Sequence, residues 1–460
     1  MGWAERTFGL AEAGTTVGRE VGGGVATFLA MSYILFVQPA FLGAAGMDPG
    51  AVLTATCLAS AAATLVMGLW ARYPIALAPG MGLNAFFAFT VCGAMGVPWQ
   101  EALALVFTSG VLFLLLGLFG LRERIVAWVP DSLKHAIAAG IGLFILLIGL
   151  KEAGFLVPDA NTLLTVGDLS GRWASVVCAG AGLLVGGALT VRRRPEAILA
   201  GIGASFMVAL MLGITSLDGV VSRPPSLAPT AFALSFDGLF TPSRLGLVLL
   251  FLYSDLFDTV GTLVGVSARA GLLRDGRLPR GGRAFFADAF GTVTGGLLGT
   301  STVTSYIEST AGVQAGARTG LASVVTGVLF LAALFFQPLV QAVGAGVPVD
   351  TVIVTTGPAF ATHTLILHPI TASALLIVGA VMAGSVARID WDEPLDALPA
   401  VAVVAGIPLC FSIADGISLG LISASALSLL AGQPRRLVWP LHALAGMLAL
   451  RWAAALLGWT

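Results

Sequence analysis

The stretch Ser254–Gly265, SDLFDTVGTLVG, carries two aspartates inside what otherwise looks like a membrane span. It follows the apolar run RLGLVLLFLY, and the two together exceed the roughly 20 residues that a helix needs to cross about 30 Å of hydrocarbon. An ionisable residue deep in a bilayer costs at least about 2.5 to 3.5 kcal/mol, so it is kept facing protein, water or a functional site. The polar and small residues of the stretch recur at helical spacing, which predicts one narrow polar face turned toward the protein interior.

The composition of the whole chain agrees with a membrane protein. It is 57% hydrophobic and 10% charged, against about 25% charged for a soluble domain. The net charge of -1 carries no information about nucleic-acid or acidic partners, because the charges lie in short loops between the spans, and we expect no nucleic-acid partner. The first twenty residues are polar, and we expect no removable signal peptide there. The apolar runs predict fourteen spans, near 21–44, 50–71, 77–95, 99–121, 131–155, 172–191, 196–215, 243–267, 283–298, 300–316, 319–343, 364–387, 396–430 and 437–458.

The chain divides into two halves of seven predicted spans. The longest polar gap, Ser216–Arg244, follows the seventh span. An odd number of spans in each half means that two halves of the same fold must be inverted relative to each other. Weak internal similarity favours this arrangement: Arg124–Leu150 is similar to His368–Met382, and Thr64–Trp70 to Thr292–Leu298. We therefore expect an all-α polytopic protein built from two inverted repeats.

The distribution of Lys and Arg over the loops predicts the orientation. Most of these residues fall on one side when the N-terminus is cytoplasmic, so both termini are predicted to be cytoplasmic. Arg435 and Arg436 fall on the other side, and a re-entrant thirteenth segment would remove that disagreement. The chain contains no nucleotide-binding loop, which disfavours ATP-driven transport. It also shows no Ser-His-Asp set or metal cluster, so we expect neither an enzyme nor a cofactor.

Two predicted spans are interrupted at corresponding places in the halves. The run of β-branched and hydroxyl residues Thr300–Ser305 disfavours a helix and predicts a short extended piece before a half-helix. In the first half, Pro74, Pro79 and Gly80 interrupt the third span in the same way. Paired interruptions of this kind indicate a binding site near the middle of the membrane. The N-termini of the two half-helices would face this site with free N–H groups.

The intramembrane acids are the first candidates for that site. Asp258 lies nearer the middle of its span than Asp255, and Glu308 lies one to two turns into the second half-helix. Asp288 is a further acid in the ninth span. For each acid the alternative is structural: a hydrogen bond to a neighbouring helix or, for Glu308, a cap on its own helix. We favour a functional role for Asp258 and Glu308 and leave both readings open for Asp288.

Uncharged candidates accompany these acids. Asn84 offers both a donor and an acceptor, as recognition of a heterocycle requires, although a buried amide can also be purely structural. Phe86 offers a stacking face, and its alternative is packing. Thr302 belongs to the hydroxyl-rich extended piece and joins the candidate set.

Five segments carry a resemblance to a known family. They are GVATFLAMSYILFVQPAFL, LAPGMGLNAFFAFTV, DLFDTVGTLVGV, LLGTSTVTSYIESTAGVQAGARTG and IPLCFSIADGISLG. Together they resemble the AzgA-like purine permeases, the adenine/guanine/hypoxanthine branch of the nucleobase-cation symporters within the nucleobase/ascorbate transporter superfamily. The resemblance runs from about residue 5 to residue 455, with its motifs in order.

This resemblance implies a division of labour along the chain. Residues 21–121 and 243–343 would form a core domain that carries the solute, and residues 122–215 and 364–458 a gate domain. Residues 1–20 would be a cytoplasmic segment and 216–242 the loop between the repeats. The family also implies proton-coupled import of adenine, guanine or hypoxanthine across the inner or plasma membrane. It further implies an elevator-like movement of core against gate, usually in a homodimer within the lipid bilayer.

The resemblance also assigns roles to residues. The family's essential acids of spans eight and ten fall on Asp258 and Glu308, and its span-three asparagine falls on Asn84. The expected substrate-binding residues are Asp258, Glu308, Asn84, Phe86 and Thr302, and the expected proton-coupling residues are Asp258, Glu308 and Asp288. Departures from the family pattern include Gln38, where asparagine is usual. No metal ligands are implied.

One rival function shares the same architecture. An anion transporter or channel with inverted repeats would need a positive residue where spans three and ten meet. The chain has no Lys or Arg between Tyr73 and Phe107, or between Ala284 and Ala317. We therefore expect a purine–proton symporter, and an anion transporter or channel remains the alternative.

Overall fold

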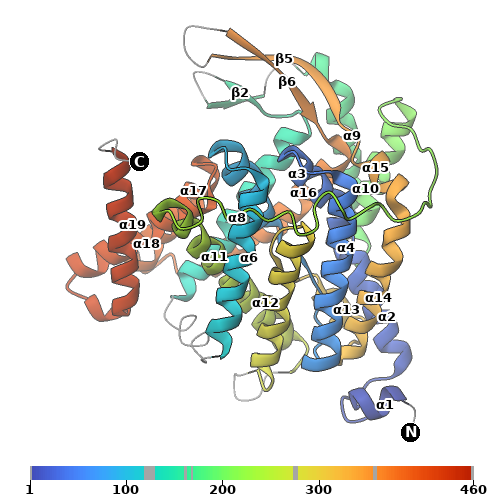
Figure 1. The fold of residues 1–460 in the computed structure, drawn as a ribbon, viewed down its shortest axis with the longest axis horizontal. Coiled ribbons are helices and arrows are strands. Elements are labelled where there is room, and N and C mark those ends of the chain that lie inside the picture. The colour runs from blue at the N-terminus through green and yellow to red at the C-terminus, as the bar shows by residue number, and fades with distance from the viewer. Residues whose placement is uncertain are drawn as a thin grey trace. The chain divides into compact units, whose positions relative to one another are not determined.

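The computed structural model of the chain describes residues 3–118, 130–159, 163–166, 169–272, 278–355 and 360–456. These residues are mostly helical, as Figure 1 shows. The first elements are α1 (Trp3–Phe8), α2 (Val17–Met31), α3 (Ile34–Ala44), α4 (Pro49–Val66), the π-helical η1 (Met67–Ala71), β1 (Leu77–Pro79), α5 (Met81–Ala85), the π-helical η2 (Phe86–Ala94) and α6 (Trp99–Leu118).

The middle of the chain continues with helices and one short hairpin. Its elements are α8 (Asp131–Glu152), β2 (Val157–Asp159), β3 (Leu163–Thr165), η3 (Ser170–Arg172), α9 (Trp173–Val191) and α10 (Ala197–Met211). After the polar gap follow α11 (Pro242–Arg269), α12 (Gly281–Leu298), β4 (Val303–Ser305), α13 (Ser309–Gln314), α14 (Gly320–Ala333), η4 (Leu334–Phe336) and α15 (Gln337–Val343).

The last part of the chain begins with a longer hairpin. Its elements are β5 (Val347–Thr355), β6 (Phe360–Leu367), α16 (Pro369–Ala383), η5 (Gly384–Arg388), α17 (Pro394–Leu409), α18 (Ile413–Leu430), η6 (Pro434–Arg436) and α19 (Trp439–Leu456). Within the described residues, seven helices are long and apolar enough to cross a membrane. The chain is therefore a multi-pass helical membrane protein, while the count of fourteen spans stays a prediction.

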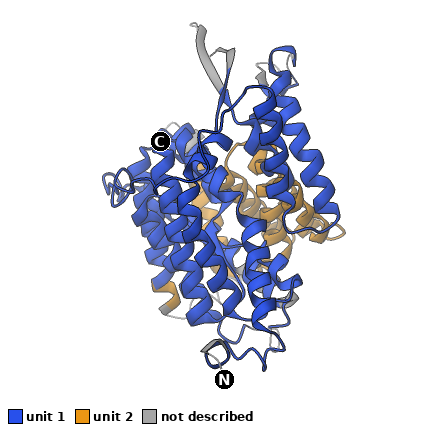
Figure 2. Ribbon diagram, turned by 90° about the vertical axis from the view of Figure 1, so that its right-hand side faces the viewer, with its two compact units in different colours: residues 1–114, 148–377 blue, residues 115–147, 378–460 orange. Residues whose placement is uncertain are grey.

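Two compact units divide the chain (Figure 2). Unit 1 comprises residues 1–114 and 148–377, and unit 2 comprises residues 115–147 and 378–460. The predicted core and gate domains have different boundaries and stay a prediction. Every candidate site residue belongs to unit 1.

Small residues allow the helices of unit 1 to pack closely. A Cβ atom on Gly24 of α2 would lie 2.7 Å from the Val325 side chain of α14. One on Gly68 of η1 would lie 2.6 Å from the Gly320 carbonyl oxygen. The buried Glu20 carboxylate of α2 accepts a hydrogen bond from the backbone N–H of Arg318, 2.8 Å away, just before α14 begins. Helices α2, α4 and α14 therefore form a tight frame with glycine at its contacts.

The predicted interruptions are present in both halves. In each case a short strand leads into a short helix: β1 into α5, and β4 into α13. The two strands pair antiparallel, with Ala78 opposite Thr304. The Gly80 N–H donates to the Thr302 carbonyl at 3.1 Å. These strands bring the starts of the two short helices together in unit 1.

Matching threonines fix the two strands to the preceding helices. Thr64 of α4 donates to the Leu77 carbonyl at 3.0 Å, and Thr292 of α12 donates to the Val303 carbonyl at 3.1 Å. Leu77 and Val303 are the first residues of their strands. This equivalence is what an inverted repeat predicts, and it agrees with the sequence similarity between the segments that begin at Thr64 and Thr292.

The polar gap between the halves lies across the ends of several helices of unit 1. Its Ser222 N–H donates to the Phe335 carbonyl at 2.9 Å, and its Pro225 carbonyl accepts from Thr54 of α4 at 3.0 Å. Farther along, Thr230 donates to the Leu298 carbonyl of α12 at 3.0 Å. The segment has no helix or strand between α10 and α11. It is therefore an ordered strap held by side-chain and backbone hydrogen bonds.

The strands β5 and β6 correct the all-α prediction. Residues 364–367, predicted to open the twelfth span, belong to β6, and α16 begins only at Pro369. The β-branched residues of both strands explain the extended backbone. Figure 1 shows this hairpin and α1 at opposite ends of unit 1.

The predicted thirteenth span, 396–430, is also wrong as a single helix. It forms two helices, α17 and α18, that pack against each other. Phe411 adopts a left-handed backbone with φ of 50°, and Ser412 then caps α18 by accepting from the Asp415 N–H. A continuous helix of this length would extend about 50 Å, well beyond the bilayer core. The turn resolves that mismatch.

Candidate functional site

The two principal acids lie close together in unit 1. Asp258 is on α11, and a Cβ atom built on Gly80, just before α5, would be 3.6 Å from its Oδ2. Glu308 immediately precedes α13. Asp258, Glu308 and the Tyr306 hydroxyl lie within electrostatic range of one another. Both acids are half-buried, so each keeps an accessible face.

Glu308 has a fixed partner from the first half of the chain. The Tyr33 hydroxyl, between α2 and α3, donates to Glu308 Oε1 at 2.9 Å. Tyr33 is 1% exposed, and its ring centroid lies 6.5 Å from that of Tyr306. The Tyr306 hydroxyl in turn donates to the Pro79 carbonyl at the end of β1. The Tyr33 phenol therefore holds one carboxylate oxygen of Glu308 in place.

Asn84 faces the same crossing from α5. Its side chain is 0% exposed, and its Oδ1 accepts a hydrogen bond from Ser301. Its Nδ2 has no partner among the described residues, and neither does the buried hydroxyl of Thr302. Buried polar groups normally find a partner, so these two atoms indicate a site completed by something else.

Phe86 is mainly a packing residue. It is 2% exposed, and its ring lies 5.0 Å from that of Phe251 with an interplanar angle of 58°. Phe86 is thus buried against α11, which also carries Asp258. This geometry matches the packing alternative. In the sequence, Phe86 follows Asn84 by two residues.

Asp288 of α12 is held by several hydrogen bonds. Its Oδ2 accepts from Thr259 at 2.6 Å, and its Oδ1 accepts from the backbone N–H and the hydroxyl of Ser305 at 2.8 and 2.9 Å. Thr259 also contacts the Thr304 hydroxyl at 2.9 Å. Asp288 therefore connects α11 and α12 to β4. Asp255 likewise accepts from Thr292 at 2.8 Å.

The structure thus brings Asp258, Glu308, Asn84 and Thr302 to one crossing of short strands. Sequence reasoning did not include three side chains there: Tyr33, Gln38 and Ser301. Gln38 carried a usable signal, because a lone amide within an apolar span needs a buried partner. Ser301 belongs to the hydroxyl-rich run Thr300–Ser305, but the run does not say which of its hydroxyls meets Asn84. Tyr33 carried no signal, because its partner is 275 residues away in sequence.

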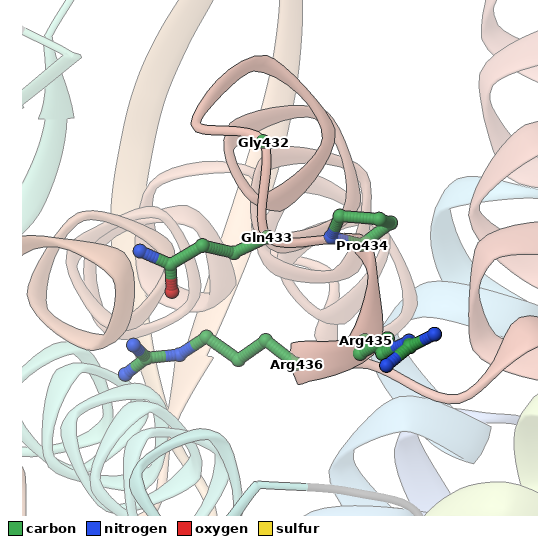
Figure 3. Close-up of a pocket in the computed structure, with 5 residues that line it drawn as sticks. All are labelled: Gly432, Gln433, Pro434, Arg435 and Arg436. Carbon is green, nitrogen blue, oxygen red and sulfur yellow. The ribbon is translucent and has the colours of Figure 1, made fainter.

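A surface hollow in unit 2 has a different character. Figure 3 shows the five consecutive residues that line it, between α18 and α19: Gly432, Gln433, Pro434, Arg435 and Arg436. Arg435 and Arg436 extend in opposite directions. Arg436 pairs with Asp396 at 2.9 Å and with Glu393 at 3.5 Å, near the start of α17. Arg435 and Arg436 therefore lie near the first residues of α17. The hollow is formed by the turn between α18 and α19.

Comparison with known proteins then gives the family. Residues 18–387 match the permease family. The chain belongs to this family. The permease is 41% identical over 438 residues to the adenine permease AdeP of Escherichia coli K12, covering 95% of this chain and 93% of that protein. It is 43% identical over 427 residues to the guanine/hypoxanthine permease PbuG of Bacillus subtilis 168, covering 90% and 91%.

These relatives confirm the predicted resemblance to AzgA-like permeases and show a transporter rather than an enzyme.

Solved structures show the fold. The transmembrane domain of the cyanobacterial bicarbonate transporter BicA has a TM-score of 0.59 at 16% identity, covering 88% of the permease and 97% of that chain. The murine Slc26a9 anion transporter has a TM-score of 0.61 at 12% identity, covering 90% and 68%. At these identities the likeness concerns architecture alone.

Proposed function

We propose that this permease imports purine nucleobases, namely adenine, guanine or hypoxanthine, by proton symport. The observation that carries the proposal is the meeting of Asp258, Glu308 and the unpaired amide nitrogen of Asn84 at the β1–β4 crossing. A purine is flat and carries ring N–H donors beside ring acceptors. The carboxylates can accept from the donors while the amide contacts another edge. Similarity to adenine and guanine/hypoxanthine permeases supports the same substrate class.

The coupling proton belongs to Asp258 or Glu308 in this proposal. Both keep an accessible face, whereas both oxygens of Asp288 accept hydrogen bonds from Thr259 and Ser305. We therefore assign Asp288, the third predicted coupling residue, to holding β4 in place. Protonation together with purine binding would neutralise the site before it moves, because an uncompensated charge is costly to carry through a bilayer. Thr302 completes the proposed site as a hydroxyl, whereas Phe86 packs against Phe251 of α11.

The movement itself is proposed from the family resemblance. A core of residues 21–121 and 243–343 would slide as an elevator against a gate of residues 122–215 and 364–458. Two copies of the chain would form a homodimer in the inner or plasma membrane, and both termini of each copy would be cytoplasmic.

Uptake of radiolabelled purines by cells that lack their own purine permeases tests the function. Expression of the chain is expected to give accumulation that a protonophore abolishes and that replacement of sodium leaves unchanged. Asp258→Ala and Glu308→Ala are expected to reduce uptake to background, because each removes an acceptor for the base. Asp218→Ala, which alters an exposed acid of the strap, is the matched control and should transport normally.

Wild-type rates in both site variants would refute the site assignment. The rival predicts a different result: accumulation of bicarbonate or chloride without purine uptake. The absence of Lys and Arg from residues 74–106 and 285–316 disfavours that rival, because an anion site at the crossing would lack a cationic side chain.

A further inference from the structure

Three buried polar side chains form a hydrogen-bonded series beside the site. Gln38 of α3, Ser301 just before β4 and Asn84 of α5 come from separate elements, and each is 0% exposed. Gln38 Nε2 donates to Ser301 Oγ at 3.2 Å, and also to Thr300 Oγ1 at 3.0 Å. Ser301 Oγ then donates to Asn84 Oδ1. The direction of donation therefore runs from Gln38 to Asn84.

That direction decides which end of the Asn84 amide is left over. A serine hydroxyl has one proton, and an amide carries donors on its nitrogen and acceptors on its oxygen. Because Ser301 accepts from Gln38, its proton is available for Asn84 Oδ1. The Asn84 Nδ2 donors are left without a partner among the described residues. A buried donor without an acceptor is costly, so the free protein lacks an acceptor that a ligand can supply.

We propose that Gln38 and Ser301 are positioning residues that hold the Asn84 amide with its nitrogen toward the substrate. The site therefore requires a hydrogen-bond acceptor, either a ring nitrogen or an exocyclic oxygen, at the edge of the base that meets Asn84. The inference rests on the proposed function. It adds that, in the contact between Asn84 and the base, Asn84 is the hydrogen-bond donor and the base is the acceptor. With Asp258 and Glu308 accepting, the site selects flat solutes that carry both donors and an acceptor.

A competition scan measures this polarity. Hypoxanthine, 3-deazahypoxanthine, 7-deazahypoxanthine and unsubstituted purine compete for uptake of one labelled base. The two deaza analogues lack the ring acceptor N3 or N7, and purine lacks the exocyclic oxygen and carries an acceptor in place of the N1–H donor. In the wild type, loss of the acceptor that meets Asn84 is expected to weaken competition about tenfold or more. In Gln38→Met and Ser301→Ala, the penalty at that same position is expected to fall to within about threefold, while penalties at other positions persist.

Two further variants separate positioning from general damage. Thr56→Val removes a hydroxyl 3.1 Å from Thr300 and should keep the wild-type pattern. Ser301→Thr keeps the hydroxyl and should restore the penalty that Ser301→Ala removes. A merely structural role would lower uptake by every variant without changing the pattern across analogues. Elution of each fluorescently tagged variant as a single peak reports that it folds.

The outcomes are distinguishable. Unchanged position-specific penalties in folded Gln38→Met and Ser301→Ala would overturn the inference while leaving the proposed function intact. A wild-type scan in which no single acceptor deletion weakens competition overturns it as well, without any variant. A wild type that takes up no purine overturns the proposed function instead.

Discussion

The Glu308 carboxylate shows how one residue of the site depends on a distant one. Its partner Tyr33 lies at the break between α2 and α3, 275 residues earlier in the chain. The phenol is buried, and its hydrogen bond holds one oxygen of the carboxylate. A hydrogen bond to a charged group contributes about 1.5–3 kcal/mol, more than one between neutral groups. In the proposed site, Tyr33 would therefore determine how Glu308 meets the purine.

Removal of the Tyr33 hydroxyl should weaken transport without unfolding the protein. In Tyr33→Phe we expect the KM for purine uptake to rise about tenfold, in line with the loss of one such bond. Tyr73→Phe is the matched control, because the Tyr73 hydroxyl accepts from the Arg280 N–H instead of contacting an acid. Initial rates over a range of purine concentrations give both values. Equal KM values for Tyr33→Phe and the wild type would contradict this role.

At the scale of helices, glycine determines how closely two elements can pack. Gly320 begins α14 and faces the backbone of Gly68 in η1, so a side chain at either position would overlap the other. By contrast, a Cβ atom on Gly22 of α2 meets nothing within 4 Å. The same residue type is therefore required at one helix contact and free at another. This contact holds η1, which continues α4, against α14.

Substitution of these glycines should separate the two cases. Gly320→Ala is expected to destabilise the protein by about 1–3 kcal/mol through overpacking and to lower its melting temperature by several degrees. Gly22→Ala should leave the melting temperature unchanged or raise it slightly, because alanine favours a helix more than glycine does. Thermal melts of the two purified proteins in the same detergent measure the difference. A Gly320→Ala protein as stable as the wild type would show that the helices can separate at no cost.

Binding of the ligand should stabilise the whole molecule. A solute that binds only the native state contributes about 2.7 kcal/mol at one hundred times its Kd. Hypoxanthine, adenine or guanine is therefore expected to raise the melting temperature of the purified permease, whereas uracil or bicarbonate should not. The purine shift should disappear in Asp258→Ala. A shift with bicarbonate alone would instead favour the rival function.

The sequence was sufficient for features that depend on local composition. Apolar runs predicted a multi-pass protein, and the hydroxyl run Thr300–Ser305 predicted an extended piece before a short helix, because both effects act within a few residues. The motifs around Asn84, Asp258 and Glu308 predicted the family. The sequence raised a re-entrant thirteenth segment only as an alternative and did not locate the turn at Phe411, because an apolar stretch has the same composition whether it crosses once or folds back.

Only the tertiary structure decided which side chains meet. Tyr33 with Glu308, and Gln38 with Ser301 and Asn84, are contacts between elements far apart in the chain, so no periodicity reports them. The same holds for Asp288, whose oxygens are engaged by Thr259 and Ser305. The physical reason is that the direction of a hydrogen bond depends on the donors and acceptors around it in space. The chain's order specifies which groups are present, and the fold determines which of them are left for a substrate.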